Sequence, residues 1–392
     1  MIDKKIFIHW LCAFFLASFV LSSGHFKSES NDSKYYTDLV VRYQNQDWQS
    51  IISPKWGVNY WGFEPSSYMR DQFPGQLILG VSMSKIGIPA EQSLHILEMA
   101  FQILSIFLLV NISLQFISYE YASALFYGLL LTPLAFSYNI RANHELGIMF
   151  FSFLALYSGL KLSKNGLWGL IVAISCTMLL MIKGPFFIFG FALSFIGYLF
   201  SKEKPKFLSM ALTLFFSAVC IVAVTYTYEI LFKNVTGESF IAEFYKIQFQ
   251  QRAMLTSYAH TMLVQKILNL YYYVWHYVVY SLIWSLFVLL IVLKNIKKID
   301  FQEKLKKFLK SPLSKCLLSS AFVFCFLFSL SDRTASRYVF PAYYLFSAWN
   351  ILLLLHLSEN FKKIQAQVIS VGLQFLAPLL WLFNFALHFF KF

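Results

Sequence analysis

Apolar residues gather along the chain in long runs that short polar stretches separate, a pattern that predicts membrane-spanning helices. About 20 apolar residues in a helix cross the hydrocarbon core of a bilayer. We therefore expect an all-α polytopic membrane protein whose residues 1–392 form a single integral membrane domain with about eleven spans. These spans are expected at residues 6–23, 93–117, 120–138, 145–161, 166–182, 184–200, 207–231, 269–293, 315–331, 337–357 and 365–389.

Three amphipathic segments separate these spans. In the first, residues 24–92, one helical face carries Tyr35, Tyr36, Leu39, Val40 and Tyr43, which predicts an interfacial helix lying in the headgroup plane. Residues 73–88 are too short for a comfortable span and predict a second juxtamembrane or re-entrant helix. The aromatic segment 232–268 predicts further interfacial helices, and the Lys-rich run 301–309 predicts a helix on the cytoplasmic surface.

The composition agrees with a membrane protein and excludes several other classes. The 392 residues are 58% hydrophobic and 13% charged, whereas soluble domains are about 25% charged. The five cysteines all lie within apolar runs and form no CxxC pair, so they indicate neither a disulfide framework nor a zinc site. The net charge of +13 is not accompanied by a clustered basic and aromatic motif, and we expect no nucleic-acid partner.

The distribution of basic residues predicts the topology. With a cytoplasmic N-terminus, the inside loops hold 17 of the 32 Lys and Arg residues but only 6 of the 19 acidic residues. Their net charge is then +11, against +2 outside, as expected for short basic loops that resist translocation. Segments 24–92 and 232–268 should therefore face outward, and segment 294–315 should face the cytoplasm. The first run also resembles a cleavable signal peptide, although we expect it to be retained.

Lys183 is the most anomalous residue for this architecture, because an ionisable group at membrane depth costs free energy and suggests function. The sequence Met181-Ile182-Lys183-Gly184-Pro185 interrupts a long apolar stretch, and its glycine and proline end the first helix. An ammonium group would thus lie where two short spans meet at a shallow, wet cavity. The alternative is a lysine that snorkels from an outer turn.

Other charged residues gather at the expected outer ends of spans. Arg337 lies one turn into an apolar span, where its guanidinium could bind a phosphate through two hydrogen bonds or simply snorkel to the interface. Glu145 could act in catalysis or merely favour the positive helix N-terminus, and Asp32 could act as a base or merely cap the following helix. The predicted site combines carboxylates (Asp32, Asp71, Glu145), phosphate-binding cations (Lys183, Arg337, Arg70, Arg141) and cavity-lining residues (Tyr35, Tyr36, His144, Tyr338).

The order of the motifs carries a family resemblance over about residues 1–360. One span is followed by Asp32-Ser33-Lys34-Tyr35-Tyr36, Arg70-Asp71-Gln72-Phe73-Pro74-Gly75, His144-Glu145, Lys183-Gly184-Pro185 and Ser336-Arg337-Tyr338-Val339-Phe340-Pro341. This arrangement resembles the GT-C class of integral-membrane glycosyltransferases, in particular the aminoarabinose transferase and protein O-mannosyltransferase-like branch. The most specific parts are Lys-Gly-Pro and Arg-Tyr-x-x-Pro in that order.

The resemblance implies an enzyme of a bacterial inner (plasma) membrane that moves a sugar from a polyprenyl-phosphate carrier to a lipid, glycan or protein acceptor at the outer face. By the same resemblance, Asp32 matches the first-loop catalytic acid and Glu145 the second acid, while Lys183 and Arg337 match the cations at the carrier phosphate. Ser33 departs from relatives that have a second acid there, and Asp71 matches an acid beside proline only approximately. We expect no large soluble C-terminal domain.

The chemistry independently fits such a transfer, which needs a base for the acceptor proton and positive charge for the departing phosphate. No cofactor is indicated with certainty, and a divalent metal held through His144, His260 or an acid stays open. Two alternatives remain: a glycan polymerase or ligase that uses diphosphate-linked donors, and a lipid or solute transporter. Transport ranks third, because a transporter places its charges near the midplane and often shows inverted repeats. The sequence names neither the sugar nor the acceptor.

Overall fold

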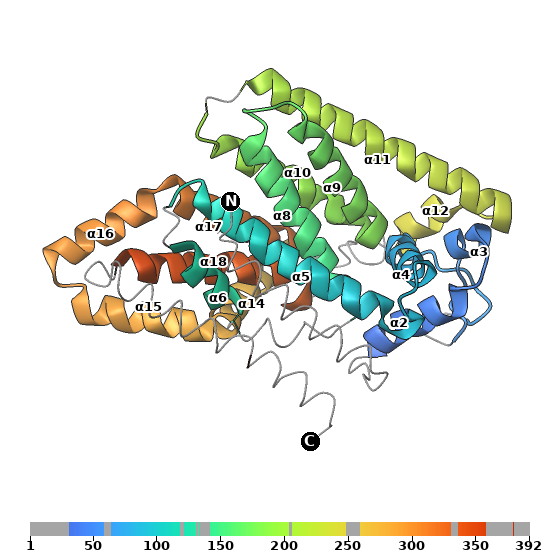
Figure 1. Ribbon diagram of the computed structural model, residues 1–392, viewed down its shortest axis with the longest axis horizontal. Helices are drawn as coiled ribbons and strands as arrows, with labels where there is room; N and C mark the ends of the chain where they lie inside the picture. Colours follow the sequence, from blue (N-terminus) through green and yellow to red (C-terminus); the bar gives the residue numbers. More distant parts are fainter. Residues whose placement is uncertain are drawn as a thin grey trace.

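The computed structural model describes residues 31–58, 64–117, 121–130, 132, 142–203, 206–247, 259–330, 336–357 and 379. Within these ranges the protein is a helical bundle with a smaller group of helices at one end (Figure 1). The helices are α2 (Asn31–Tyr43), α3 (Trp48–Ile52), α4 (Gly75–Lys85), α5 (Ala90–Leu114), α6 (Ala122–Leu130), α8 (Glu145–Lys161), α9 (Trp168–Lys183), η2 (Gly184–Phe186), α10 (Phe187–Leu199), α11 (Phe207–Thr236), α12 (Phe240–Tyr245), α14 (Ala259–Tyr280), α15 (Leu282–Asn295), α16 (Ile299–Lys310), α17 (Pro312–Ser329), η4 (Ser336–Val339) and α18 (Phe340–Leu357).

The all-α, polytopic membrane architecture is confirmed, but the count of eleven spans is not. Five described segments are long and apolar enough to cross a membrane: Ala90–Leu114, Trp168–Leu199, Phe207–Thr236, Pro312–Ser329 and Phe340–Leu357. A sixth is present if the bent pair α14 and α15 counts as one span. The spans expected at 6–23 and 365–389, and most of the one at 120–138, lie outside the described residues.

The segment Trp168–Leu199 folds back on itself. As a straight helix, its 32 residues would measure about 48 Å, well beyond the roughly 30 Å of a bilayer core. Instead, α10 packs along α9, since a Cβ built on Gly190 would lie 2.7 Å from Sγ of Cys176. The reversal occurs at Gly184, whose φ of 59° favours glycine, and it leaves Lys183 at the tip of the hairpin.

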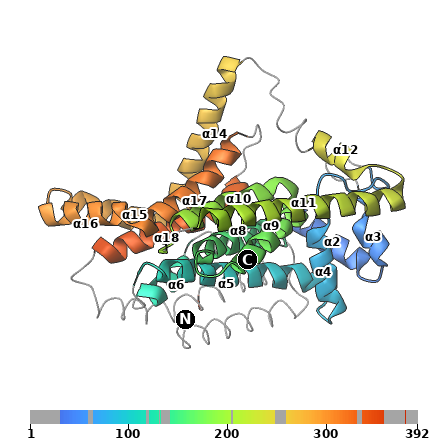
Figure 2. The ribbon, with the colours of Figure 1, turned by 90° about the horizontal axis from the view of Figure 1, so that it is seen from above.

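The span expected at 269–293 is wrong as a single helix. The structure places α14 and α15 at an angle of 86°, and α14 points away from the bundle (Figure 2). Ser281 lies between the two helices, and its hydroxyl contacts the Tyr277 carbonyl at 2.6 Å and the Ser285 hydroxyl at 2.7 Å. Asn350 of α18 donates a further hydrogen bond to Ser285 at 3.1 Å. We attribute the bend to these polar side chains, because a side chain that inserts into the backbone hydrogen-bond ladder can kink a helix.

Helix α8 forms the centre of the bundle, packed against α5, α9 and α10. Its contact with α10 is close because both helices present glycines. A Cβ on Gly159 would overlap the carbonyl group of Ser194, and a Cβ on Gly197 would overlap that of Leu156. Small residues that allow backbones to approach are typical of helix packing in membranes.

Helices α2 and α4 form a small group of their own against the start of α5, with α3 beside them. The apolar face of α2 was expected to lie in the headgroup plane, but Leu39 and Val40 are buried with Leu77, Val81 and Leu94 in a separate core cluster. Helical periodicity alone does not distinguish a face that meets lipid from a face that meets protein. Helix α4, with 11 residues and a length of about 17 Å, is too short to cross the membrane.

Candidate functional site

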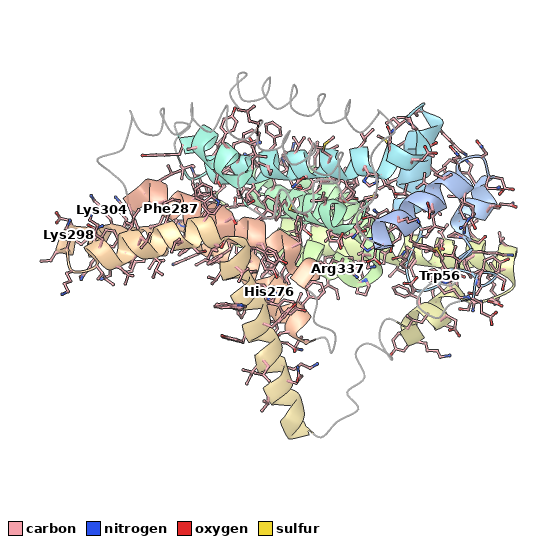
Figure 3. The ribbon with its side chains drawn as sticks, turned by 90° about the horizontal axis from the view of Figure 1, so that it is seen from below. Trp56, His276, Phe287, Lys298, Lys304 and Arg337 are labelled. Atoms are coloured by element: carbon pink, nitrogen blue, oxygen red, sulfur yellow. The ribbon has the colours of Figure 1, made fainter. Side chains whose placement is uncertain are left out.

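Asp32 and Arg337 form an ion pair that joins the two ends of the described chain. Asp32 lies in the first turn of α2 and Arg337 lies in η4, immediately before α18. The aspartate side chain is 19% exposed and the arginine side chain is 36% exposed. The pair is therefore partly shielded yet accessible, and Figure 3 shows Arg337 between the bundle and the small group of helices that contains Trp56.

Lys183 contacts a hydrogen-bonded chain of neutral groups, and its charge, like that of Arg337, acts on His144. Its Nζ donates to Oε1 of Gln72 at 3.2 Å, and Nε2 of Gln72 donates to the hydroxyl of Tyr36 at 3.1 Å. The ring of Tyr36 meets the ring of His144 edge to face, with centroids 5.0 Å apart. Helices α2 and α9, the loop before α4 and the loop before α8 thus converge at one place.

His144 is fixed by α4 in one tautomer. Nε2 of Gln76 donates to the Asn143 carbonyl at 2.7 Å, so its Oε1 is the acceptor that faces Nδ1 of His144 at 2.9 Å. Nδ1 therefore carries the proton, and Nε2 carries the lone pair. Burial lowers the pKa of His144 well below its usual range, and the positive charges of Lys183 and Arg337 lower that pKa further. His144 is thus a neutral imidazole near both cations.

Glu98, on the third turn of α5, holds the start of α8. Its Oε2 accepts hydrogen bonds from the backbone N–H groups of Leu146 and Gly147 at 3.0 and 3.1 Å. These N–H groups belong to the first turn of α8, where backbone donors lack partners within the helix. Glu98 therefore fixes the helix end that carries His144 and Glu145, and its own carboxyl group is fully buried.

The loop before α4 owes its position to an aromatic cluster. Phe73 is buried against Tyr228 of α11 and against Phe240 and Phe244 of α12, with centroids 4.8 to 5.3 Å apart. This anchor sets the position of the adjacent Gln72. Segment 232–268, where interfacial helices were expected, contains the end of α11, the whole of α12 and the start of α14. Phe240 and Phe244 of α12 pack on protein.

The other predicted site residues occupy different positions. Arg70 forms an ion pair with Glu238 from the second long segment, and Asp71 beside it is partly buried. Glu145, the first residue of α8, is buried close enough to Glu98 for their charges to interact. Tyr35 points into the core of the small helical group, where its hydroxyl lies 3.4 Å from the sulfur of Met69. Arg141 and the side chains of Tyr338 and His260 lie outside what the structure describes.

Gln72, Gln76, Glu98 and Asn143 belong to this site but were absent from the sequence-based set. Glu98 could have been found, because it is an ionisable residue within an expected span, which is the criterion that identified Lys183. The two glutamines and the asparagine are uncharged, and nothing in their spacing points to a shared network. Among the described residues, no group of three or more His, Cys, Asp or Glu side chains is arranged to hold a metal ion.

The fold is that of a known membrane protein. The chain superposes on the crystal structure of ArnT from Cupriavidus metallidurans bound to undecaprenyl phosphate with a TM-score of 0.62 at 13% identity, covering 90% of this chain and 60% of that chain. The apo crystal structure of the same protein gives a TM-score of 0.57 at 12% identity, covering 88% of this chain and 59% of that one. The chain therefore spans about 60% of the length of these structures. No protein-family model and no curated protein matches the sequence.

Proposed function

We propose that this chain, which has the fold of the GT-C glycosyltransferase ArnT, transfers a sugar from a polyprenyl-phosphate carrier to an acceptor at the outer face of the membrane. The observation that carries the proposal is the convergence of Asp32 and Arg337 with the Lys183 network, from segments as far as 305 residues apart. A carboxylate and two cations at one partly open place provide the groups that this reaction needs.

In the proposed reaction, the donor phosphate binds Lys183 and Arg337. Because Arg337 is paired with Asp32, the phosphate takes the place of that carboxylate on the guanidinium. A guanidinium matches a phosphate through two parallel hydrogen bonds, so the exchange loses little of the electrostatic stabilisation of the arginine. Asp32 is then available as an acceptor for the proton of the incoming hydroxyl group.

The transfer step needs no further reactant, because Asp32 takes the proton and polyprenyl phosphate is the leaving group. The acceptor oxygen forms a bond to the anomeric carbon as its proton passes to Asp32, and the bond from that carbon to the phosphate oxygen breaks. Polyprenyl phosphate leaves with the bonding electrons, and its added negative charge is stabilised by Lys183 and Arg337. Tyr36 and the neutral imidazole of His144 would line the space for the sugar, and Glu145 and Asp71 remain candidates for a second acid.

Transfer by the full-length protein in nanodiscs, measured with radiolabelled polyprenyl-phosphate sugars and membrane lipid extracts, tests this proposal. We expect transfer by the wild-type protein and loss of transfer in Asp32→Asn, with Asp38→Asn as the matched control. Asp38 lies on the same helix but is exposed away from the site.

Parallel reactions with polyprenyl-diphosphate sugars address the glycan polymerase or ligase alternative. Use of the diphosphate donor alone would contradict the proposal, and so would binding of donor lipid without transfer to any acceptor, as a transporter would show.

A further inference from the structure

A pocket lies at the opposite end of the helices that carry the candidate site. It has a volume of about 650 Å³, which is within the usual size of a ligand site, and it is enclosed by the ends of α5, α10, α16, α17 and α18. Arg337 precedes α18, whereas Leu355 and His356 near the end of that helix line the pocket. Leu355 follows Arg337 by 18 positions, which corresponds to about 27 Å of helix, close to the thickness of a bilayer core.

The lining of this pocket is amphipathic and positively charged. Phe116, Leu199 and Leu352 contribute apolar surface. The two lysines of the lining come from different elements, Lys202 from the loop after α10 and Lys307 from α16. No carboxylate is among its described lining residues. Glu203, the acid adjacent to Lys202, is instead engaged with Lys164 at 3.4 Å. The two pocket lysines therefore present positive charge to whatever enters.

Helix α16, which carries Lys307, is held against α18 by aromatic packing. This helix buries Phe301 and Phe308, and the exposed Lys307 beside Phe308 lines the pocket. The ring of Phe308 packs against Trp349 and His356 of α18, with centroids 5.8 and 5.5 Å apart. Figure 3 shows Lys298 and Lys304 of this region at the end of the molecule opposite Trp56. The amphipathic helix is thus one side of a formed cavity.

We propose that this pocket binds the phosphate headgroup and upper acyl chain of an anionic glycerophospholipid from the leaflet opposite the candidate active site. Two lysines without a carboxylate select a negative headgroup, and the aromatic and aliphatic walls accept a hydrocarbon chain. Basic pockets between membrane helices are known to bind anionic lipid headgroups. A soluble anion would satisfy the lysines but leave the apolar walls in contact with water, which disfavours it. The inference is independent of the proposed glycosyl transfer.

Thermal unfolding of the full chain in neutral detergent, titrated with phosphatidylglycerol, tests the site. We expect the lipid to raise the Tm of the wild-type protein, and Lys202→Gln together with Lys307→Gln to weaken binding roughly 25-fold, about fivefold for each lysine. Lys206→Gln together with Lys306→Gln removes the same charge from neighbouring positions outside the pocket, and should leave binding unchanged. Asp32→Asn should also leave it unchanged.

A second variant protects the test against misfolding. Leu355→Trp fills the pocket while retaining both lysines, and Leu355 is only partly buried, so we expect loss of lipid binding without loss of folded protein. Lipid binding as tight as that of the wild-type protein, in either Leu355→Trp or the double lysine variant, would overturn the proposal. Equal stabilisation by phosphatidylcholine, displacement by millimolar inorganic phosphate, or tighter binding of polyprenyl phosphate in this pocket would each overturn the assignment to an anionic glycerophospholipid.

Discussion

Replacing Asp32 by asparagine should change donor binding and turnover in opposite directions. In the structure Asp32 holds Arg337, the residue proposed to bind the donor phosphate, so the carboxylate competes with the donor. The pair is partly exposed, and ion pairs of that kind contribute about 0–1 kcal/mol. Releasing Arg337 should therefore tighten donor binding by up to roughly fivefold. Loss of the general base should lower turnover by roughly 10²- to 10⁴-fold.

Two measurements on the same nanodisc samples separate these effects. Equilibrium binding of a labelled polyprenyl phosphate gives donor affinity, and single-turnover transfer gives the chemical step without product release. Asparagine caps a helix about as well as aspartate does, so the start of α2 should stay intact. Asp38→Asn, on the exposed face of α2, should leave both values unchanged. Near-normal transfer in Asp32→Asn would reduce Asp32 to a helix cap, and weaker donor binding would refute the competition between carboxylate and phosphate.

Three further predictions address the phosphate site, the fold and the topology. Arg337→Lys keeps the charge but loses the two-point geometry, so donor affinity should fall. Lys183→Ala should weaken donor binding as well. If the two effects on the free energy of donor binding were strictly additive in a double-mutant cycle, that would count against one shared phosphate. Glu98→Ala leaves two buried N–H groups without an acceptor and should lower the free energy of unfolding by about 2–5 kcal/mol. Glu98→Gln keeps an acceptor oxygen and should lower the free energy of unfolding less. Equal melting temperatures of Glu98→Ala and the wild-type protein would contradict this role. A cysteine replacing Lys55 should react with an impermeant maleimide in sealed cells and one replacing Lys304 should not, and the reverse labelling would invert the predicted topology.

The sequence predicted those parts of the fold that depend on local pattern. Apolar runs located helices α5, α8, α9, α10, α11, α17 and α18 to within about five residues at each end. The Gly-Pro pair after Lys183 marked the turn of the α9–α10 hairpin. The bend at Ser281 was missed because its cause is a set of hydrogen bonds, one of them from Asn350 on another helix. The apolar face of α2 was placed against lipid because amphipathicity does not identify the partner of a face.

The candidate site was predictable only in part. Charged residues at the ends of spans stand out against an apolar background, which is why Asp32, Lys183 and Arg337 could be named. Their arrangement could not be inferred. Within helical reach along the sequence, Arg337 has no acid that would be a natural partner, whereas the fold supplies one from 305 residues away. Gln72 likewise joins the site only because α4 and α9 meet.

The partners of the two cations suggest how the proposed site receives an anionic donor. Arg337 is paired with a carboxylate, so binding a phosphate there exchanges one anion for another and leaves the local charge nearly balanced. The hydrogen-bond partner of Lys183 is instead the neutral carbonyl oxygen of Gln72, which orients the ammonium group without cancelling its charge. Lys183 can therefore attract the phosphate before Arg337 changes partner. Because the carboxylate released in that exchange is the proposed base, donor binding itself would make Asp32 available for the proton of the acceptor.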